Sequence, residues 1–128
     1  MSLVYRVQDR EGRGPWRPGF SRLWVEDRDD HDNLIPWPTQ FGFEIIPKSD
    51  GHLGCGCKTK EQLQRWFTPT EYTTLHSYGF TAVQMEVDRV LAESDIQLVF
   101  QRTKPLRKDV LAFDLYAERV ALREGLAA

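Results

Sequence analysis

The stretch from Gly51 to Arg102 constrains the fold most, because it combines helix-start signals with the two-residue alternation of β-strands. It opens on the string His-Leu-Gly-Cys-Gly-Cys at 52–57, which predicts a short glycine-rich strand. A strand of this kind that leads into a helix often holds an anionic ligand, because unpaired N–H groups and the helix dipole point at the site. The glycines also permit close packing or close approach of a ligand to the backbone. We therefore expect the candidate site here.

Two helices are predicted directly after this strand. Thr59 precedes a Gln by three residues and Thr68 precedes a Glu by three residues, and both spacings match a capping box. Pro69 at the first helical position and Gly79 beyond the last turn support the second helix. The predicted elements of this stretch are helices over about 60–67 and 69–78 and strands, each with one polar-leaning face, over 81–87 and 95–100.

The flanking regions add three further elements. Residues 3–8 alternate as a strand, in which Arg6 lies on the face opposite the aromatic and aliphatic side chains. The glycines and prolines over 12–19 predict turns, which aromatic residues anchor. Residues 21–49 are rich in Pro, Trp and Asp, with little periodicity except around 41–46. We expect long ordered loops there, with one or two short strands, that act as a lid over a site. Residues 109–125 are expected to form an amphipathic helix that starts at an Asp N-cap.

These elements predict one α+β domain over residues 1–128, in which a mixed or antiparallel sheet is packed by two short helices and the C-terminal helix. A net charge of −2 disfavours nucleic acid as a partner, and we expect the basic run at 102–108 to be a solvated connection. The sequence has neither a membrane-length apolar run nor a secretory signal, so we expect a soluble cytoplasmic protein. Its two cysteines, Cys55 and Cys57, are expected to be reduced thiols.

The order of these motifs resembles small ADP-ribosyltransferase domains of bacteria and phages. Tyr5-Arg6 is similar to the family's first strand motif, residues 55–59 to its strand that enters a helix, and residues 83–88 with 95–100 to its strand pair. The resemblance implies a cytoplasmic domain of bacterial or prophage origin that binds NAD or an ADP-ribose-like ligand. The residues that it implies for the ligand cleft are Arg6, Cys57, Thr59 and Gln97.

Gln97 occupies the position that matches the catalytic Glu of that family. The Glu carboxylate holds a ribose hydroxyl of NAD and stabilises the positive charge that develops as nicotinamide leaves, whereas a neutral amide can do only the first. We therefore expect a ligand-binding or interaction domain with degenerate chemistry. An active transferase that uses Glu86 or Glu93 is one alternative, and a structural protein that binds a partner or a second copy through its Trp- and Pro-rich region is another.

Other chemistry is less well supported by the sequence. His52, Cys55, Cys57 and His76 are residue types that zinc accepts, but their spacing is poor, so no metal site is predicted. Cys57 lies just before a predicted helix, where a thiol can become a nucleophile if a histidine acts as base, although buried inert cysteine is commoner. The acidic run at 26–32 is expected to be a solvated loop, and Trp24 or Trp37 could stack on a ligand.

Overall fold

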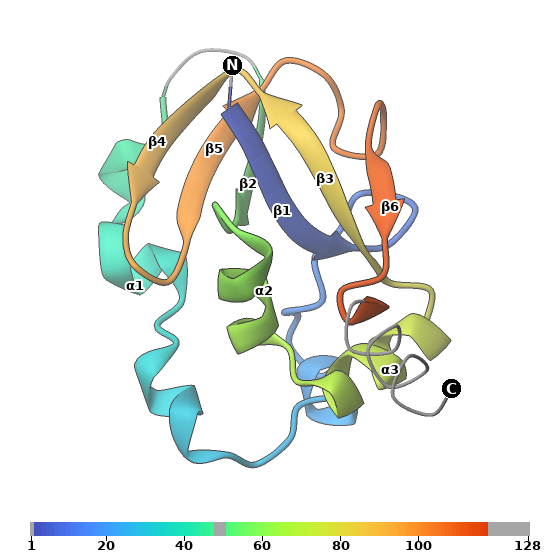
Figure 1. Cartoon of the computed structure of the whole chain (residues 1–128). Helices are drawn as coiled ribbons and strands as arrows, with labels where there is room; N and C mark the ends of the chain where they lie inside the picture. Colours follow the sequence, from blue (N-terminus) through green and yellow to red (C-terminus); the bar gives the residue numbers. More distant parts are fainter. Residues whose placement is uncertain (1, 48–50, 118–128) are drawn as a thin grey trace.

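Two three-stranded antiparallel sheets form the frame of the domain in the computed structural model, which describes residues 2–47 and 51–117 (Figure 1). Their strand orders are β1-β3-β6 and β2-β5-β4. A bridge joins the sheets, because Tyr5 and Cys57 exchange two backbone hydrogen bonds of 2.9 and 2.7 Å. The strands are β1 (Ser2–Gln8), β2 (His52–Gly56), β3 (Thr81–Val87), β4 (Arg89–Glu93), β5 (Leu98–Arg102) and β6 (Leu111–Phe113). The predicted α+β class is confirmed, with two sheets in place of one.

Helices α2 (Lys60–Trp66) and α3 (Pro69–Ser77) begin where the sequence predicts. Both capping boxes form: the hydroxyls of Thr59 and Thr68 accept the N–H of the third helical residue, whose side chain accepts the N–H of the Thr in return. Gly79 follows α3 with φ +89°, a left-handed conformation that glycine adopts without strain. The two helices lie beyond the lower ends of the strands in Figure 1.

The segment between the first two strands contains short helices and no strand among its described residues. They are η1 (Ser21–Leu23), η2 (Asp29–Asn33), α1 (Trp37–Phe41) and η3 (Phe43–Ile45). The expectation of a short strand around 41–46 is therefore wrong. Residues 37–41 form helix α1, Gly42 ends it with φ +80°, and the next three residues form a 3-10 turn. Figure 1 shows α1 lying beside the β2-β5-β4 sheet.

The strand pair after α3 also differs from the prediction. A strand over 95–100 was expected, but β5 begins at Leu98, and the turn at 94–97 connects it to β4, which the sequence analysis did not identify. A register shift between Val90 and Ala92 interrupts the alternation that would have revealed β4. Every residue of β5 is buried, so the expected polar-leaning face of this strand is absent.

The predicted C-terminal helix is wrong at its start. Leu111–Phe113 forms strand β6, which pairs with β3, and Asp109 has φ +53°, so it is no helix N-cap. The helical spacing of apolar residues began only at Phe113, which is the last residue of β6. The rest of the expected helix, from 118 to 125, lies outside the described residues.

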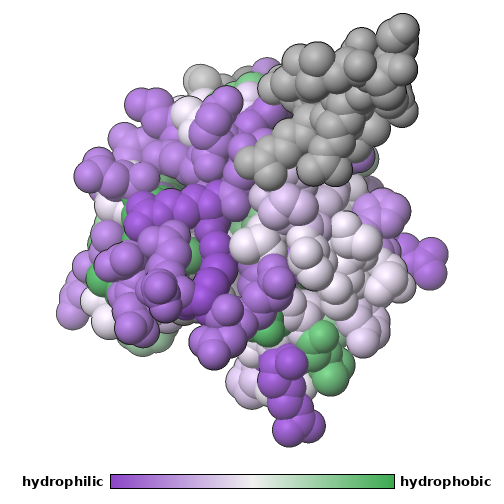
Figure 2. Space-filling model, turned by 60° about the horizontal axis from the view of Figure 1, so that its bottom comes forward, coloured by the Kyte–Doolittle hydropathy of each residue, from purple (hydrophilic) through white to green (hydrophobic). Residues whose placement is uncertain are grey.

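Two apolar clusters form the core. The first lies between the two sheets, around Val4, Met85 and Phe100. The second joins the helices to the first sheet, around Trp24 and Leu63. Trp24 is 3% exposed and belongs to this second cluster, so of the two tryptophans that could stack on a ligand, Trp24 is ruled out by burial. Figure 2 shows that on one face hydrophobic residues form small separate groups among hydrophilic ones. Within the described ranges, no helix has the length and apolar character to span a membrane.

Candidate functional site

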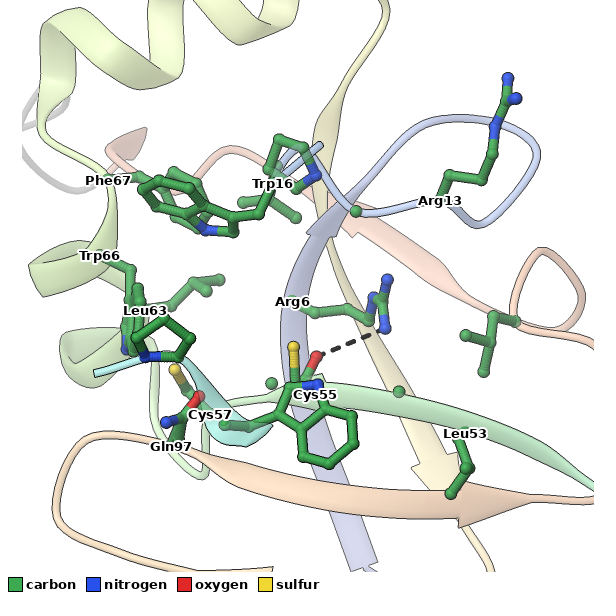
Figure 3. A pocket seen from close by; sticks show the side chains of 18 of the residues that line it. Arg6, Arg13, Trp16, Leu53, Cys55, Cys57, Leu63, Trp66, Phe67 and Gln97 are labelled. Atoms are coloured by element: carbon green, nitrogen blue, oxygen red, sulfur yellow. Dashed lines mark hydrogen bonds between the residues drawn. The ribbon is translucent and has the colours of Figure 1, made fainter. Parts of the chain in front are cut away.

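A pocket of about 690 Å³ lies where β1 and β2 approach each other, between the loop after β1, α1 and α2 (Figure 3). This volume is within the range of roughly 300 to 1,000 Å³ that is typical of small-molecule sites. The lining residues come from parts of the chain that are far apart in sequence. They include Arg6 of β1, residues 12–17, Leu34 with residues 36–38, residues 53–57, Leu63, Trp66 and Phe67 near α2, Gln97 and Leu106.

Arg6 is the most unusual residue of this pocket. Alternation along β1 turns its side chain to the buried face, and it is only 7% exposed. Nη1 donates to the Cys55 carbonyl at 3.4 Å and Nη2 to the Gly12 carbonyl at 3.3 Å, both longer than usual, while Nε is buried without a partner. No ion pair to Arg6 occurs among the described residues. Burial lowers the pKa of the guanidinium, although Cys55 and Asp9 act in the opposite direction.

Glycines make the space that this guanidinium occupies. A Cβ on Gly54 would lie 2.5 Å from Arg6 Nη1 and 2.5 Å from Phe100 Cζ. A Cβ on Gly56 would lie 2.7 Å from the Tyr5 carbonyl oxygen, so this glycine lets β2 approach β1 closely. The expectation that the glycines of 52–57 permit close packing is confirmed.

The charge of the lining is strongly positive for a protein whose net charge is −2. Arg6, Arg13 and Arg17 line the pocket, and no Asp or Glu occurs among the described lining residues. Asp9 offsets part of this charge from outside the lining, because it forms an ion pair with Arg13 at 3.2 Å. The guanidinium of Arg17 lies 5.0 Å from the centre of the Phe20 ring, and its Nε is buried without a hydrogen-bond partner. The pocket therefore suits an anion.

Aromatic side chains form the other half of the pocket. Figure 3 shows Trp16, Trp66 and Phe67 on one side, with Arg6 and Arg13 on the other. Trp66 is held in place because its Nε1 donates to the Ile96 carbonyl at 2.8 Å. The ring of Trp16 packs 6.2 Å from Trp66 and 6.4 Å from Phe67 but remains 44% exposed. Trp37 of α1 also lines the pocket.

Both cysteines line the pocket as free thiols. Burial raises the pKa of Cys55, and burial with the charge of Cys55 raises the pKa of Cys57 to about 12. Cys57 Sγ also donates to the Ile96 carbonyl at 3.7 Å. A nucleophilic cysteine needs a lowered thiol pKa, so these shifts oppose the hypothesis that Cys57 is a nucleophile.

Gln97 lines the pocket and also holds the segment around α1. It is 5% exposed, and its Nε2 donates to the Ile35 carbonyl at 2.6 Å and to Gln40 Oε1 at 2.9 Å. Ser94 Oγ adds a third hydrogen bond, to Gln40 at 3.0 Å. Because Gln40 belongs to α1, these bonds tie α1 and its neighbouring residues to the turn before β5.

Of the four residues expected in the cleft, Arg6, Cys57 and Gln97 line the pocket, and Thr59 does not. Thr59 is exposed and its hydroxyl is used as the N-cap of α2. The alternative catalytic residues, Glu86 on β3 and Glu93 on β4, are also exposed and outside the described lining.

The four weak metal candidates are not gathered at one point. His52 is exposed at the start of β2 and His76 is exposed on α3, whereas the two cysteines face the pocket. No group of three or more His, Cys, Asp or Glu residues that could hold a metal ion occurs within residues 2–47 and 51–117. In the acidic loop, Asp30 accepts two hydrogen bonds of 2.9 Å from Arg65, and these bonds lower the pKa of its carboxyl to about 2.

The loop after β1 contributes lining residues that were not predicted from the sequence. Residues 12–19 were expected to form turns, yet Arg13, Trp16 and Arg17 all line the pocket. Two arginines on either side of a tryptophan, within a run of Gly and Pro, were the available signal. Such a loop exposes its side chains, and conformationally restricted residues hold them in place.

The fold and the site define a small α+β domain with a cationic, aromatic-lined pocket at the junction of two antiparallel sheets. A family model described as "Bacteriophage T4 Y00F protein" matches residues 1–114, and the chain belongs to this phage family. Comparisons with curated proteins and with solved structures give no match.

Proposed function

We propose that this protein is a small-molecule-binding domain whose pocket takes an anionic ligand of the NAD or ADP-ribose class, without transferase chemistry of its own. The observation that carries the proposal is the buried guanidinium of Arg6, whose Nε lacks a partner at the edge of a ligand-sized pocket. A buried cation without a counter-ion is unfavourable by several kcal/mol, roughly, after relaxation of its surroundings. A ligand phosphate or carboxylate would supply both the missing charge and the missing acceptor.

The arrangement of the chain adds support. An arginine strand, a glycine-rich strand that enters a helix, and a later strand pair follow one another, as in the family that the sequence resembles. Three pocket residues, Arg6, Cys57 and Gln97, come from these three pieces. The free thiols fit a reducing compartment, so a cytoplasmic location forms part of the proposal.

The absence of transferase chemistry is inferred from the polar groups of the pocket. Gln97 supplies an amide where a carboxylate is needed, and its Nε2 already donates two hydrogen bonds to the segment around α1. Glu86 and Glu93 lie outside the described lining, and neither is positioned to replace it. A neutral amide cannot stabilise the positive charge that develops when nicotinamide leaves.

Isothermal titration calorimetry with ADP-ribose and NAD at low ionic strength tests the proposal. We expect saturable binding to the wild-type protein, at least about tenfold weaker binding to Arg6→Met, and unchanged binding to Arg89→Met, which removes an exposed charge on β4. No binding at millimolar ligand, or equal binding to both variants, contradicts the proposal. Incubation with labelled NAD and a cell extract should release no nicotinamide, and release that depends on Arg6 would establish the transferase alternative.

Partner binding is a second candidate, favoured by exposed apolar residues near the Trp- and Pro-rich region. Leu23, Ile35 and Phe43 are 53%, 38% and 66% exposed. A homodimer or complex formed through this region predicts a mass above that of the 14.9 kDa monomer in light scattering. Substitution of Phe43 by Ser should then restore the monomer, whereas a monomeric wild-type protein excludes the homodimer.

A further inference from the structure

The pocket has a cationic half and an aromatic half. A ligand that fills both must carry a planar or apolar group as well as a negative charge. The guanidinium of Arg6 lies on one side and the rings of Trp16, Trp66 and Phe67 lie on the other (Figure 3). A small inorganic anion would satisfy the first half only. It would leave the apolar half, including the 44% exposed indole of Trp16, in contact with water.

The rings of the aromatic half are held in position by hydrogen bonds and by contacts with one another. The indole of Trp66 is fixed by its hydrogen bond of 2.8 Å to Ile96, and Trp16 packs against both Trp66 and the buried Trp24, whose ring centre is 4.6 Å away. Trp24 is fixed in turn, because its Nε1 donates to the Pro15 carbonyl at 3.3 Å. Rings held in this way can stack on a planar group without losing much conformational freedom.

The cationic half favours more than one negative charge. Arg6 and Arg17 each have a buried Nε without a hydrogen-bond partner, and no carboxylate occurs among the described lining residues. A phosphate monoester carries up to two charges and several acceptor oxygens, so it matches this set of donors better than a single carboxylate does.

Resting on the proposed function, we infer how the pocket recognises the two ends of this nucleotide ligand: the base stacks on Trp16 while a phosphate binds Arg6. The two recognition elements act together, because they line one pocket of about 690 Å³. Stacking of a base on an aromatic side chain contributes roughly 1 to 3 kcal/mol, which corresponds to about 5- to 150-fold in affinity. Neither a base-free sugar phosphate nor a phosphate-free nucleoside can use both halves.

Calorimetric titration with three probes tests the inference: AMP, ribose 5-phosphate and adenosine. We expect AMP to bind about tenfold or more tighter than either of the other two. Trp16→Leu should reduce AMP affinity by at least about fivefold and leave ribose 5-phosphate affinity unchanged. The ratio of the two affinities within one variant corrects for any loss of folded protein. Tyr78→Leu is a matched control, since Tyr78 is 50% exposed and lies outside the described lining.

The outcomes separate the inference from the proposed function. Ribose 5-phosphate binding within about twofold of AMP, or equal losses for both ligands in Trp16→Leu, overturns the stacking of the base on Trp16 and leaves phosphate binding at Arg6 intact. Adenosine binding as tightly as AMP overturns both, because the phosphate would then contribute nothing. Failure of both phosphate compounds to bind also overturns both.

Discussion

Two buried arginines with opposite surroundings allow the role of Arg6 to be tested by stability alone. Arg6 donates two long hydrogen bonds and has an unpartnered Nε, whereas Arg102, 3% exposed, has all of its guanidinium nitrogens bonded. Arg102 Nε donates to the Glu86 carbonyl at 2.9 Å, and its Nη atoms donate to three carbonyls in the loop before β6 at 2.6 to 2.9 Å. If Arg6 serves a ligand and Arg102 serves the fold, replacing each by Met should have opposite effects.

The expected magnitudes follow from these contacts. Arg6→Met removes an uncompensated buried charge and an unpartnered donor, which is unfavourable by about 1 to 3 kcal/mol, and loses only two weak bonds. Its free energy of unfolding should therefore be equal to that of the wild type or higher by about 1 to 2 kcal/mol. Arg102→Met leaves several carbonyls without their charged donor and should lower the free energy of unfolding by about 3 to 5 kcal/mol.

Equilibrium unfolding in urea, followed by the fluorescence of the four tryptophans, measures both effects. ADP-ribose at about 100 times the wild-type Kd should stabilise the wild type by about 2.7 kcal/mol but Arg6→Met by only about 1.4 kcal/mol or less, because the variant binds it at least about tenfold more weakly. A loss of about 3 kcal/mol or more in Arg6→Met without ligand would show that Arg6 is structural, and would refute the reasoning.

Three further predictions concern residues around the pocket. Gly54→Ala brings a Cβ within 2.5 Å of Arg6 Nη1, so it should lower stability by about 1 to 3 kcal/mol and weaken ADP-ribose binding; unchanged affinity would contradict the packing account. Thr59→Ala removes the N-cap of α2 and should lower stability by about 1 kcal/mol, with ligand affinity unchanged, and a specific loss of binding would restore Thr59 to the site. In Cys55→Ser protein, Cys57 at pH 8 should be alkylated by iodoacetamide much more slowly than a free thiol, because burial, the larger cause of its raised pKa, remains when Cys55 is removed. Its rate should still rise above about pH 10, where a free thiol has levelled off; a plateau by about pH 10 would contradict the raised pKa.

The helix starts could be predicted from the sequence because their signals are local. A capping box needs only a Thr and a Gln or Glu three residues later, and both boxes, at Thr59 and Thr68, form as expected. Strand β4 could not be found in the same way, because the register shift at Val90 interrupts its alternation. The start of the expected C-terminal helix was wrong for another reason: its apolar spacing began only at Phe113, and the residues before it, from the expected N-cap at Asp109, had no helical pattern of their own.

The candidate site was predicted only in part, because burial depends on tertiary contacts. Arg102 was expected in a solvated basic run, yet the carbonyls of the loop that follows it enclose its guanidinium. Arg6 was recognised from its strand, but the glycines that make its space come from β2 and from the loop after β1. Trp16 was predicted only to anchor the turns after the first strand. No local sequence pattern shows that an indole lines a pocket, because this depends on which distant segments pack beside it.

The Nε–H resonance of Arg6 in a nitrogen-edited NMR spectrum tests the central claim most directly, since it observes the unpartnered donor itself. Titration with AMP should shift this signal in a saturable way with the affinity measured by calorimetry, while the fully bonded Nε–H of Arg102 stays unchanged. An Arg6 signal that does not move when AMP is saturating would contradict the claim that this guanidinium receives the anion.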